Sequence, residues 1–587
     1  METKTTAGGS KSFIIPPEKP GLKIALSVIA TLIAAAVGYY LYLPALNPKS
    51  IQLWLYLAGV VVSFVVFLAI FSGATRKQEY MPFVRRKAFV PVIIVVALVL
   101  TMLVGYLVGC PLFRARDYSQ LLSVNNAEAT DFAADIEQVD AASFSKIPRL
   151  DEDSAKQIAP KAMSDLGDSS TVSQYTVYPT YTQINYKGSP VRVVPLQYAN
   201  IIKWLTNTSR GLPGYIIIDM ANEEPSFVML DEDSYMRYSP AEHFGKLLKR
   251  HLRFNYPTYL FGEATFEIDD NGKPYWICPR LDNTIGLFGG TDIIGAVLVE
   301  ADSEDGDSVY YGIDELRENP ELQWIDRVYD SQLLVKQFNY AGKYGEGFWN
   351  SLLGQRDVRA ATDGYNYLAL NDDVYLYTGV SSVTSDQSII GFVLINQRTK
   401  QSSFYRVSGA TEKAAMGSAE GYVTDLGYQA TFPLLINVDG QPTYYMSLKD
   451  TTNNNQIVKQ YALINVRNYN KIGAHADSIS KVLELYKTAL ANNAPASEES
   501  GQAAGEDVYF SGKISDIRTA VIGGESTYYI TLTLDDNEIA KGEMSFRTTA
   551  AENESVVFLN KGQWVKILVK GYSQGTDLLP INAISLK

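Results

Sequence analysis

The chain has 587 residues, a formal net charge of −13, and only 2 cysteines and 3 histidines. A chain of this length exceeds one ordinary hydrophobic core, so several domains are expected. Two cysteines exclude a disulfide scaffold. The acidic excess argues against nucleic acid as a partner, because a nucleic-acid-binding surface must neutralise phosphates.

Three apolar stretches dominate the first 112 residues, and they cover 22–43, 51–71 and 89–108. Each is close to the roughly 20 residues that a helix needs to cross a bilayer. Lys23, at the edge of the first stretch, is their only charge. Helices buried in a soluble protein would show a polar face. The sequence therefore predicts a tail over 1–21 and three transmembrane helices within 22–112.

Basic residues predict the orientation of these helices, because cytoplasmic loops are enriched in lysine and arginine. The first loop carries only Lys49, whereas the tail and the second loop carry Lys4, Lys11, Lys19, Lys23, Arg76, Lys77, Arg85, Arg86 and Lys87. We therefore expect a multi-pass protein of the cell membrane with a cytoplasmic N-terminus and an extracytoplasmic C-terminal part. Arg114 and Arg116 oppose this rule, because they follow the third helix on the predicted extracytoplasmic side, where few basic residues are expected.

Composition divides the remaining chain into four segments. Residues 113–147 are rich in alanine, serine and acids and are interpreted as a stalk or linker. Residues 148–491 form a repeat region, and 492–507 read as a flexible linker because they are poor in apolar residues. Residues 508–587 contain five runs of strand-forming residues. Cys110 ends the motif "LVGC", which is either a helix end or a site of lipidation.

A G-x-P turn followed by strand-forming residues recurs in the repeat region. The turn glycines are Gly188, Gly272 and Gly440, which are separated by 84 and 168 residues, and Gly364 offers a version without proline near the missing interval. Helices are expected before the turns, over 151–167, 239–254 and 409–427, with Ser239 as an N-cap. The predicted unit is a helix followed by antiparallel hairpins.

This unit, with its strand, acidic turn and strand in "IIGAVLVEADSEDGDSVYYGIDEL", resembles PepSY-type domains. These are small α+β modules found outside bacterial membranes and in propeptides of thermolysin-type proteases. The resemblance implies a role in modulating a protease or in local interactions of the envelope.

The C-terminal segment resembles the OB-fold of the family called tRNA-anticodon-binding-like, through "GKI", "FLNKGQWVKILVKG" and the closing "AISL". The resemblance implies an all-β barrel that binds oligonucleotides or sugars on one face. From Asp507 onward the segment holds 8 basic and 10 acidic residues. Binding of a nucleic-acid strand requires a basic groove, so we expect no nucleic-acid partner.

No catalytic, cofactor-binding or metal-binding residue is predicted. His243 and His251 are eight residues apart, too far to share a metal on one helix, and His475 is isolated. No zinc-protease, nucleophile-elbow or phosphate-loop motif occurs. Acidic clusters at 150–154, 230–234 and 302–308 are interpreted as solvated turns or helix starts, with calcium binding as the alternative.

The stretch "DDNGKPYWICP" (269–279) combines acids, aromatic residues and Cys278. Asn271-Gly272 predicts a two-residue hairpin turn, and Pro274 predicts the first residue of a strand or an edge strand. Alternation places Tyr275 and Ile277 on one face and buries Trp276 and Cys278 on the other. The same alternation predicts that Glu267 and Asp269 face solvent.

Together these patterns predict a membrane-anchored bacterial envelope protein with a large extracytoplasmic interaction domain and no catalytic activity. The expected partners are the lipid bilayer and an envelope or membrane protein, with cell-wall polysaccharide left open. Two alternatives remain, namely an extracytoplasmic modulator of a protease or cell-wall enzyme, and a subunit of a transport or signalling complex. The oligomeric state is left open.

Overall fold

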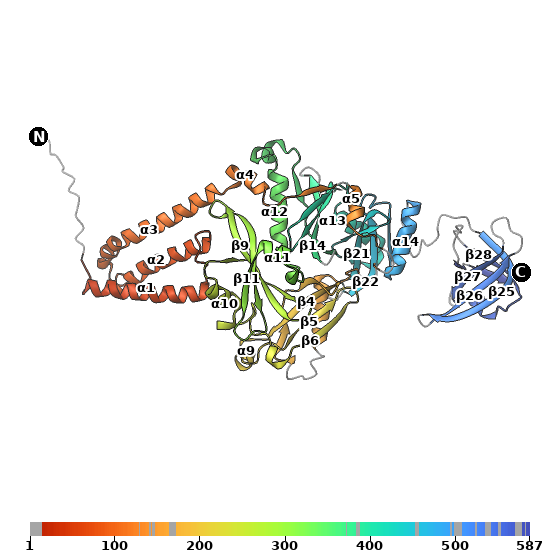
Figure 1. Ribbon diagram of the computed structural model, residues 1–587, viewed down its shortest axis with the longest axis horizontal. Coiled ribbons are helices and arrows are strands. Elements are labelled where there is room, and N and C mark those ends of the chain that lie inside the picture. The colour runs from red at the N-terminus through yellow and green to blue at the C-terminus, as the bar shows by residue number, and fades with distance from the viewer. Residues whose placement is uncertain are drawn as a thin grey trace. The chain divides into compact units, whose positions relative to one another are not determined.

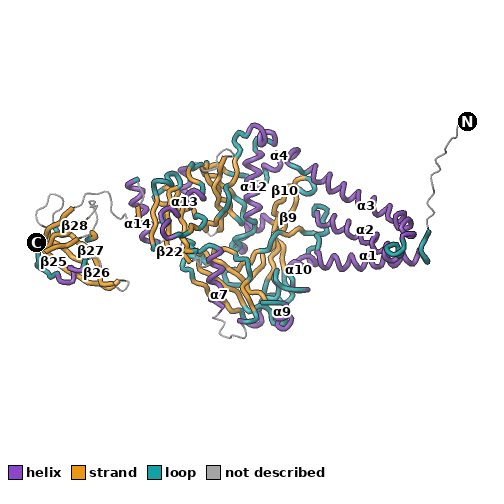
Figure 2. Tube along the Cα trace, turned by 180° about the vertical axis from the view of Figure 1, so that it is seen from behind, coloured by secondary structure: helices purple, strands orange, loops and turns teal. Residues whose placement is uncertain are grey.

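The computed structural model describes most of the chain, and Figures 1 and 2 show its helices and strands. Contacts divide the chain into two units, of which one holds residues 1–460 and 464–469, and the other holds 461–463 and 470–587. The described residues are 15–127, 129–139, 143, 147–163, 172–370, 373–382, 388–451, 457–493, 496–497, 508–522, 525–534, 542–549, 553–569, 578–581 and 583–586.

Three long helices occupy the apolar stretches, as predicted: α1 (Pro20–Tyr42), α2 (Ile51–Ser72) and α3 (Met81–Val108). All three are long and apolar enough to cross a membrane. Most of their large side chains are exposed, for example Leu32 at 64 % and Phe89 at 66 %. Exposure of leucine and phenylalanine along a whole helix is stable only in an apolar solvent, which supports membrane association.

The loop between α1 and α2 and the residues after α3 contact the repeat region directly. In the loop between α1 and α2, the amide of Leu46 donates to the Pro257 carbonyl at 2.8 Å, and Lys49 pairs with Asp282 at 2.7 Å. After α3, Gly109 approaches the repeat region, because a Cβ on Gly109 would lie 2.9 Å from the Ile285 carbonyl oxygen. The ends of α1 and α3 and the start of α2 therefore lie on the same side as the repeat region.

One element order recurs four times in the repeat region. In each module a helix is followed by a sheet that is built around one long strand. A short strand and the first strand of the hairpin both pair with this long strand, and the long strand also pairs with the strand that follows it. Module 1 (152–229) consists of α7 (Glu152–Ala162), β2 (Tyr175–Val177), β3 (Thr182–Tyr186), β4 (Ser189–Tyr198), α9 (Ile201–Asn207), β5 (Gly214–Asp219) and β6 (Glu224–Met229).

The next two modules repeat this order. Module 2 (248–312) consists of α10 (Leu248–Asn255), β7 (Leu260–Phe261), β8 (Thr265–Ile268), β9 (Pro274–Ile285), β10 (Gly289–Glu300) and β11 (Ser308–Gly312), and α11 (Ile313–Glu318) follows it. Module 3 (331–405) consists of α12 (Ser331–Tyr344), β12 (Arg359–Ala361), β13 (Asn366–Leu370), β14 (Asp373–Ser382), β15 (Ser388–Ile389), β16 (Gly391–Asn396) and β17 (Ser402–Tyr405).

Module 4 (412–465) closes the series. It consists of α13 (Glu412–Tyr422), β19 (Gln429–Ala430), β20 (Leu434–Val438), β21 (Gln441–Asp450) and β22 (Ile457–Asn465), and β18 (Gly409–Ala410) precedes it. The second unit then holds β23 (Gly473–Ala476), α14 (Ile479–Asn492) and β24 (Ala496–Ser497), and β24 pairs with β23 in parallel.

The hairpin turns do not recur at a constant interval. Gly188 and Gly440 lie in turns of the predicted two-residue kind, where Lys187 and Asp439 also have positive φ. Gly364 is not a turn glycine, because it precedes β13, and the matching turn joins Leu370 to Asp373 at positions outside the described residues. The 168 residues between Gly272 and Gly440 are therefore divided into two unequal intervals by the turn between Leu370 and Asp373.

The turn after β8 also differs from its prediction. Ile268 pairs with Pro274, so five residues connect the strands, and only Gly272 among them has positive φ, at 85°. Asp269 organises the loop, because its carboxylate accepts the amides of Asn271 and Lys273, each at 2.9 Å. Such a turn with glycine in the left-handed region is the longer hairpin class. Pro274 is the first residue of β9, as predicted.

The helix predicted over 239–254 is shorter than its sequence pattern suggests. Phe244 has a φ of 48°, which interrupts a right-handed helix, so α10 begins only at Leu248 with Leu247 as its N-cap. Ser239 therefore does not cap this helix, and its hydroxyl accepts the Ala241 amide instead. The other two predicted helices correspond to α7 and α13.

The described part of 113–147 is not a free stalk. It contains α4 (Pro111–Ser119), β1 (Asn125–Ala127) and α5 (Ala129–Asp135), and β1 pairs in parallel with β17. Phe132 is fully buried, and its ring lies 5.2 Å from that of Phe392. Aromatic residues buried between segments hold this stretch against module 3. The linker predicted over 492–507 lies mostly outside the described residues.

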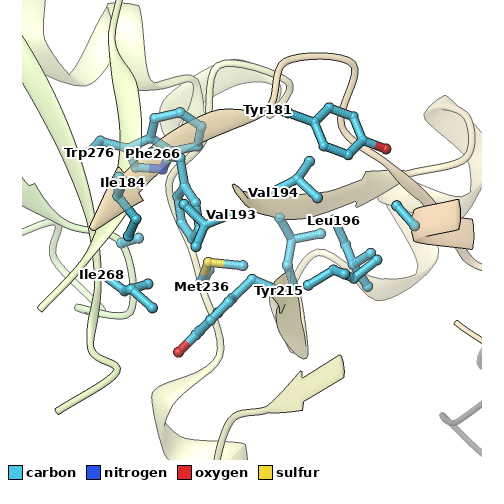
Figure 3. Close-up of a cluster of buried hydrophobic side chains, with 14 of the residues drawn as sticks. Tyr181, Ile184, Val193, Val194, Leu196, Tyr215, Met236, Phe266, Ile268 and Trp276 are labelled. Carbon is cyan, nitrogen blue, oxygen red and sulfur yellow. The ribbon is translucent and has the colours of Figure 1, made fainter. Parts of the chain in front are cut away.

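One large apolar core lies between the sheets of modules 1 and 2. Figure 3 shows Val193, Val194 and Leu196 of β4 among Tyr215, Phe266 and Trp276. Trp276 and Cys278 belong to this core, whereas Tyr275 and Ile277 pack in the neighbouring core, as alternation predicted. Burial raises the pKa of the Cys278 thiol, which makes it a small apolar side chain rather than a nucleophile.

The C-terminal strands form one six-stranded sheet with its own core. β25 pairs with β26 and β28, β27 pairs with β26 and, in parallel, with β29, and β28 pairs with β30. The strands are β25 (Val508–Ile522), β26 (Glu525–Leu534), β27 (Glu543–Thr549), β28 (Trp564–Val569), β29 (Leu578–Pro580) and β30 (Ala583–Leu586).

Candidate functional site

A groove of about 440 Å³ lies where modules 1, 3 and 4 meet residues 136–139, 143 and 147–148. We call it the central groove. Its walls are mainly apolar and come from Leu368 and Leu370 of β13, Leu434 and Ile436 of β20, and the residues Ile136, Val139, Ile147, Pro148 and Pro190. An apolar concavity with a few polar groups is the usual form of a ligand site.

Polar groups reach the central groove at Tyr367 and Asn185. Arg327 donates to the Tyr367 hydroxyl at 2.9 Å, and its guanidinium lies 4.7 Å from the centre of the Tyr367 ring. The backbone amide of Asn185 donates a hydrogen bond to the Asp326 carboxylate at 2.5 Å. Two of the polar positions at the groove, Tyr367 and Asn185, are therefore fixed by adjacent residues of the segment that joins modules 2 and 3.

Glu267 of β8 holds that joining segment in place. Its two carboxylate oxygens accept the amides of Asp326 and Arg327 at 2.9 and 3.0 Å. The side chain is fully buried, and burial raises its pKa to about 7 against the opposing effect of these backbone donors. Both oxygens accept hydrogen bonds from the joining segment, so the arrangement supports the groove.

The prediction that Glu267 faces solvent was wrong. Phe266 and Ile268 face the core between modules 1 and 2, and the segment around Asp326 covers the opposite face of β8. Alternation assigns one face of a strand to solvent only where nothing covers it. Asp269, by contrast, lies in the turn that it caps.

Buried glutamates recur at the other two module junctions. Glu242, between modules 1 and 2, accepts the indole N–H of Trp204 on α9. Glu412, at the start of module 4, accepts the Gly379 amide of β14 at 2.6 Å and the Thr362 hydroxyl at 2.9 Å. Burial raises the pKa of both carboxyl groups. Each of the three junctions between consecutive modules therefore contains one buried glutamate with donors from the neighbouring module or joining segment.

The stability of the full chain should fall as pH rises from 5 to 8, in part because of Glu242. Burial raises the pKa of Glu242 from 4.5 to about 7, so its contribution is present below pH 4.5 and lost as pH rises through 7. The upper limit of this contribution is about 3 kcal/mol. Thermal unfolding in detergent should show a smaller fall for Glu242→Gln than for the parent, and equal falls would contradict the assignment.

The histidines and acidic clusters do not converge on a metal site. Among the described residues no group of three or more histidine, cysteine or acidic side chains could hold a metal ion. His251 contacts the Gly306 carbonyl at 2.8 Å, and His243 packs edge-on against Trp204. Asp151 caps α7 through the Ser154 amide at 3.0 Å and pairs with Lys449. The clusters at 150–154 and 302–308 therefore act as a helix start and a turn.

The glycine-rich stretch 286–292 has a packing role. It forms the tip of the β9–β10 hairpin, and a Cβ on Gly105 of α3 would lie 2.9 Å from side-chain atoms of Leu287 and Phe288. Gly109 similarly approaches the backbone of Ile285. Glycine at these positions lets the third apolar helix contact the hairpin closely. Cys110 follows directly and is the N-cap of α4.

Comparisons with known proteins identify no family for this chain. No family model matches it, and no curated protein matches it. Among solved structures, a levansucrase mutant of B. megaterium aligns over 77 % of this chain and 97 % of its own, with 9 % identity and a TM-score of 0.16. A TM-score this low supports neither a shared fold nor a shared activity.

Proposed function

We propose that this chain is a membrane-anchored, non-catalytic binding protein of the bacterial envelope, and that the central groove takes an extended peptide segment of an envelope or membrane protein. The observation that carries the proposal is the groove itself, which is apolar along its walls and polar at Tyr367 and Asn185. Exposed side chains on three apolar helices support the membrane location.

Strand edges favour a peptide over a compact ligand. β13 pairs only with β14 among the described strands, and β20 meets the segment 136–139 only around Asn437. Both strands contribute residues to the groove. An extended peptide can satisfy its backbone groups on such edges while its side chains enter apolar pockets.

Charge supports an extracytoplasmic position for the repeat region. The ends of α1 and α3 that contact this region carry few basic residues, whereas the opposite ends carry the lysines and arginines of the tail and of 76–87. The positive-inside rule then assigns the basic ends to the cytoplasm. Proteinase treatment of intact cells should remove the repeat region, and protection of residues beyond 120 would contradict this orientation.

The peptide site is tested by photo-crosslinking of the full chain in its own membrane. A photoreactive residue at Leu370, in the groove, should capture a partner protein, whereas one at Leu426, exposed on module 4, should not. Filling the groove with Ala369→Trp should abolish capture from Leu370. Equal capture from both positions, or capture unaffected by the added indole ring, would refute the site.

We also propose that the repeat region consists of PepSY-type modules and that residues 508–587 form an OB-type barrel. A helix followed by hairpins, repeated four times, supports PepSY-type modules. For 508–587, the parallel pair β27–β29 and the pairing of β25 with both β26 and β28 support an OB-type barrel. With 8 basic against 10 acidic residues from Asp507 onward, its partner would be a protein or a neutral sugar rather than nucleic acid.

A further inference from the structure

An exposed apolar patch lies beside the end of the third apolar helix. Leu112 and Phe113 of α4 are 43 % and 68 % exposed, and Trp349, Leu352 and Leu353 in the turn after α12 are 64 %, 57 % and 77 % exposed. We call these five residues the apolar shelf. Five large apolar side chains exposed in two adjacent segments mark an interaction surface.

A continuous row of aromatic rings connects the two segments of the shelf. Tyr118 of α4 lies 6.5 Å from Tyr344 of α12, and Tyr344 stacks on Phe348 at 6.3 Å. Phe348 in turn lies 5.6 Å from Trp349. Figure 1 shows the segment that follows α12 beside α4. The shelf is therefore built on a packed aromatic base.

The local backbone keeps the shelf side chains pointing outward. A single π-helical turn spans Asn350–Gly354, and the buried Ser351 donates its hydroxyl to the Phe348 carbonyl at 2.7 Å. Gln355 then adopts a φ of 48°, and the Asn350 side chain donates to the Arg356 carbonyl at 2.8 Å. With Ser351 turned inward, Leu352 and Leu353 remain on the outside.

Continuity with α3 indicates what covers the shelf. Tyr106, Leu107 and Val108, at the end of α3, are 66 %, 48 % and 46 % exposed, and α4 begins three residues after this helix. Tryptophan and phenylalanine are side chains that settle at the boundary between lipid chains and water. The exposed apolar surface thus runs from the lipid-facing helix onto the shelf.

Basic residues beside the shelf favour an anionic bilayer surface. Arg114 and Arg116 of α4 are exposed, and the described partner of Arg114, Asp117, lies at 3.4 Å on an equally exposed site. Phospholipid head groups attract arginine next to an interfacial helix.

We propose that the apolar shelf inserts into the interfacial layer of the same bilayer that α1–α3 cross, next to anionic head groups. The inference rests on the proposed membrane location and goes beyond it, because it makes the repeat region lie against the lipid surface at α4 and the turn after α12. The partner is therefore lipid rather than a second protein.

Spin labels on the full chain test this inference in vesicles of phosphatidylethanolamine and phosphatidylglycerol. In a Cys110→Ser background, with Cys278 fully buried, single labels are placed through Leu353→Cys, Leu107→Cys and Leu426→Cys. Collision rates with oxygen and with a water-soluble nickel complex are then compared. Leu107 is the bilayer control, and Leu426, exposed on module 4, is the water control.

The label at Leu353 should have an oxygen-to-nickel ratio several-fold above that at Leu426. A ratio equal to that at Leu426 would overturn the inference, and low collision with both reagents would overturn it by showing a protein cover. If the label at Leu107 were itself accessible to nickel, the membrane-spanning proposal would fail instead. The two failures are therefore distinguishable.

Discussion

Replacing Glu267 with alanine should lower the free energy of unfolding of the full chain by roughly 2–6 kcal/mol, because two buried amides lose their acceptor. These amides belong to Asp326 and Arg327, and the Glu267 side chain is fully buried. Chemical unfolding in detergent measures the change. Capture of a partner through the photoreactive residue at Leu370 should fall as well, since Arg327 would no longer hold Tyr367 in place.

Glu263 provides the matched control for Glu267. It precedes the same strand by two residues and is exposed. Glu263→Ala should therefore change the free energy of unfolding by less than about 0.5 kcal/mol. Similar effects of the two substitutions would mean that the joining segment is not held by Glu267.

Replacing Asp373 with alanine should cost about 3–5 kcal/mol, because it leaves an uncompensated buried charge on Arg398. Arg398 donates to both Asp373 oxygens at 2.7 and 2.9 Å, and about one tenth of each side chain is exposed. The pair joins β14 to the turn after β16 within module 3. Thermal unfolding in detergent should show the loss directly.

A second substitution distinguishes the cost of the unpaired Arg398 charge from the cost of losing the packing of the Asp373 side chain. The double variant Asp373→Ala with Arg398→Met should recover much of the stability, because it removes the unpaired cation as well. Asp314→Ala breaks the exposed pair with Arg317, where the Asp314 side chain is 86 % exposed, and should cost less than about 1 kcal/mol. A double variant no more stable than Asp373→Ala would contradict a charge-based cost.

The three junction glutamates suggest a common mechanism for keeping the modules in register. Glu242, Glu267 and Glu412 are each buried, and each accepts donors from a neighbouring module or a joining segment. A buried carboxylate without these donors would be costly, so only one relative position of the modules satisfies it. The central groove depends on this register, because its walls come from three modules.

Local sequence patterns correctly predicted the features that depend on local hydropathy rather than on contacts with distant segments. The apolar stretches predicted α1, α2 and α3, and alternation in β9 correctly separated Trp276 and Cys278 from Tyr275 and Ile277. The helix α12 was not predicted. The assumed constant interval also failed, since loops between strands differ in length without changing the strand order.

Functional geometry was beyond the sequence because it depends on distant segments. Nothing near Glu267 in the chain indicates that residues 326 and 327 cover it, and nothing in 136–139 indicates that these residues meet β20. Likewise, the apolar shelf combines α4 with a turn more than 230 residues later. By itself the sequence determined the apolar spans and the two faces of β9, because these follow from local hydropathy and residue type. Burial of charge, the central groove and the shelf were decided only by tertiary structure, since each depends on which surface is covered by another segment.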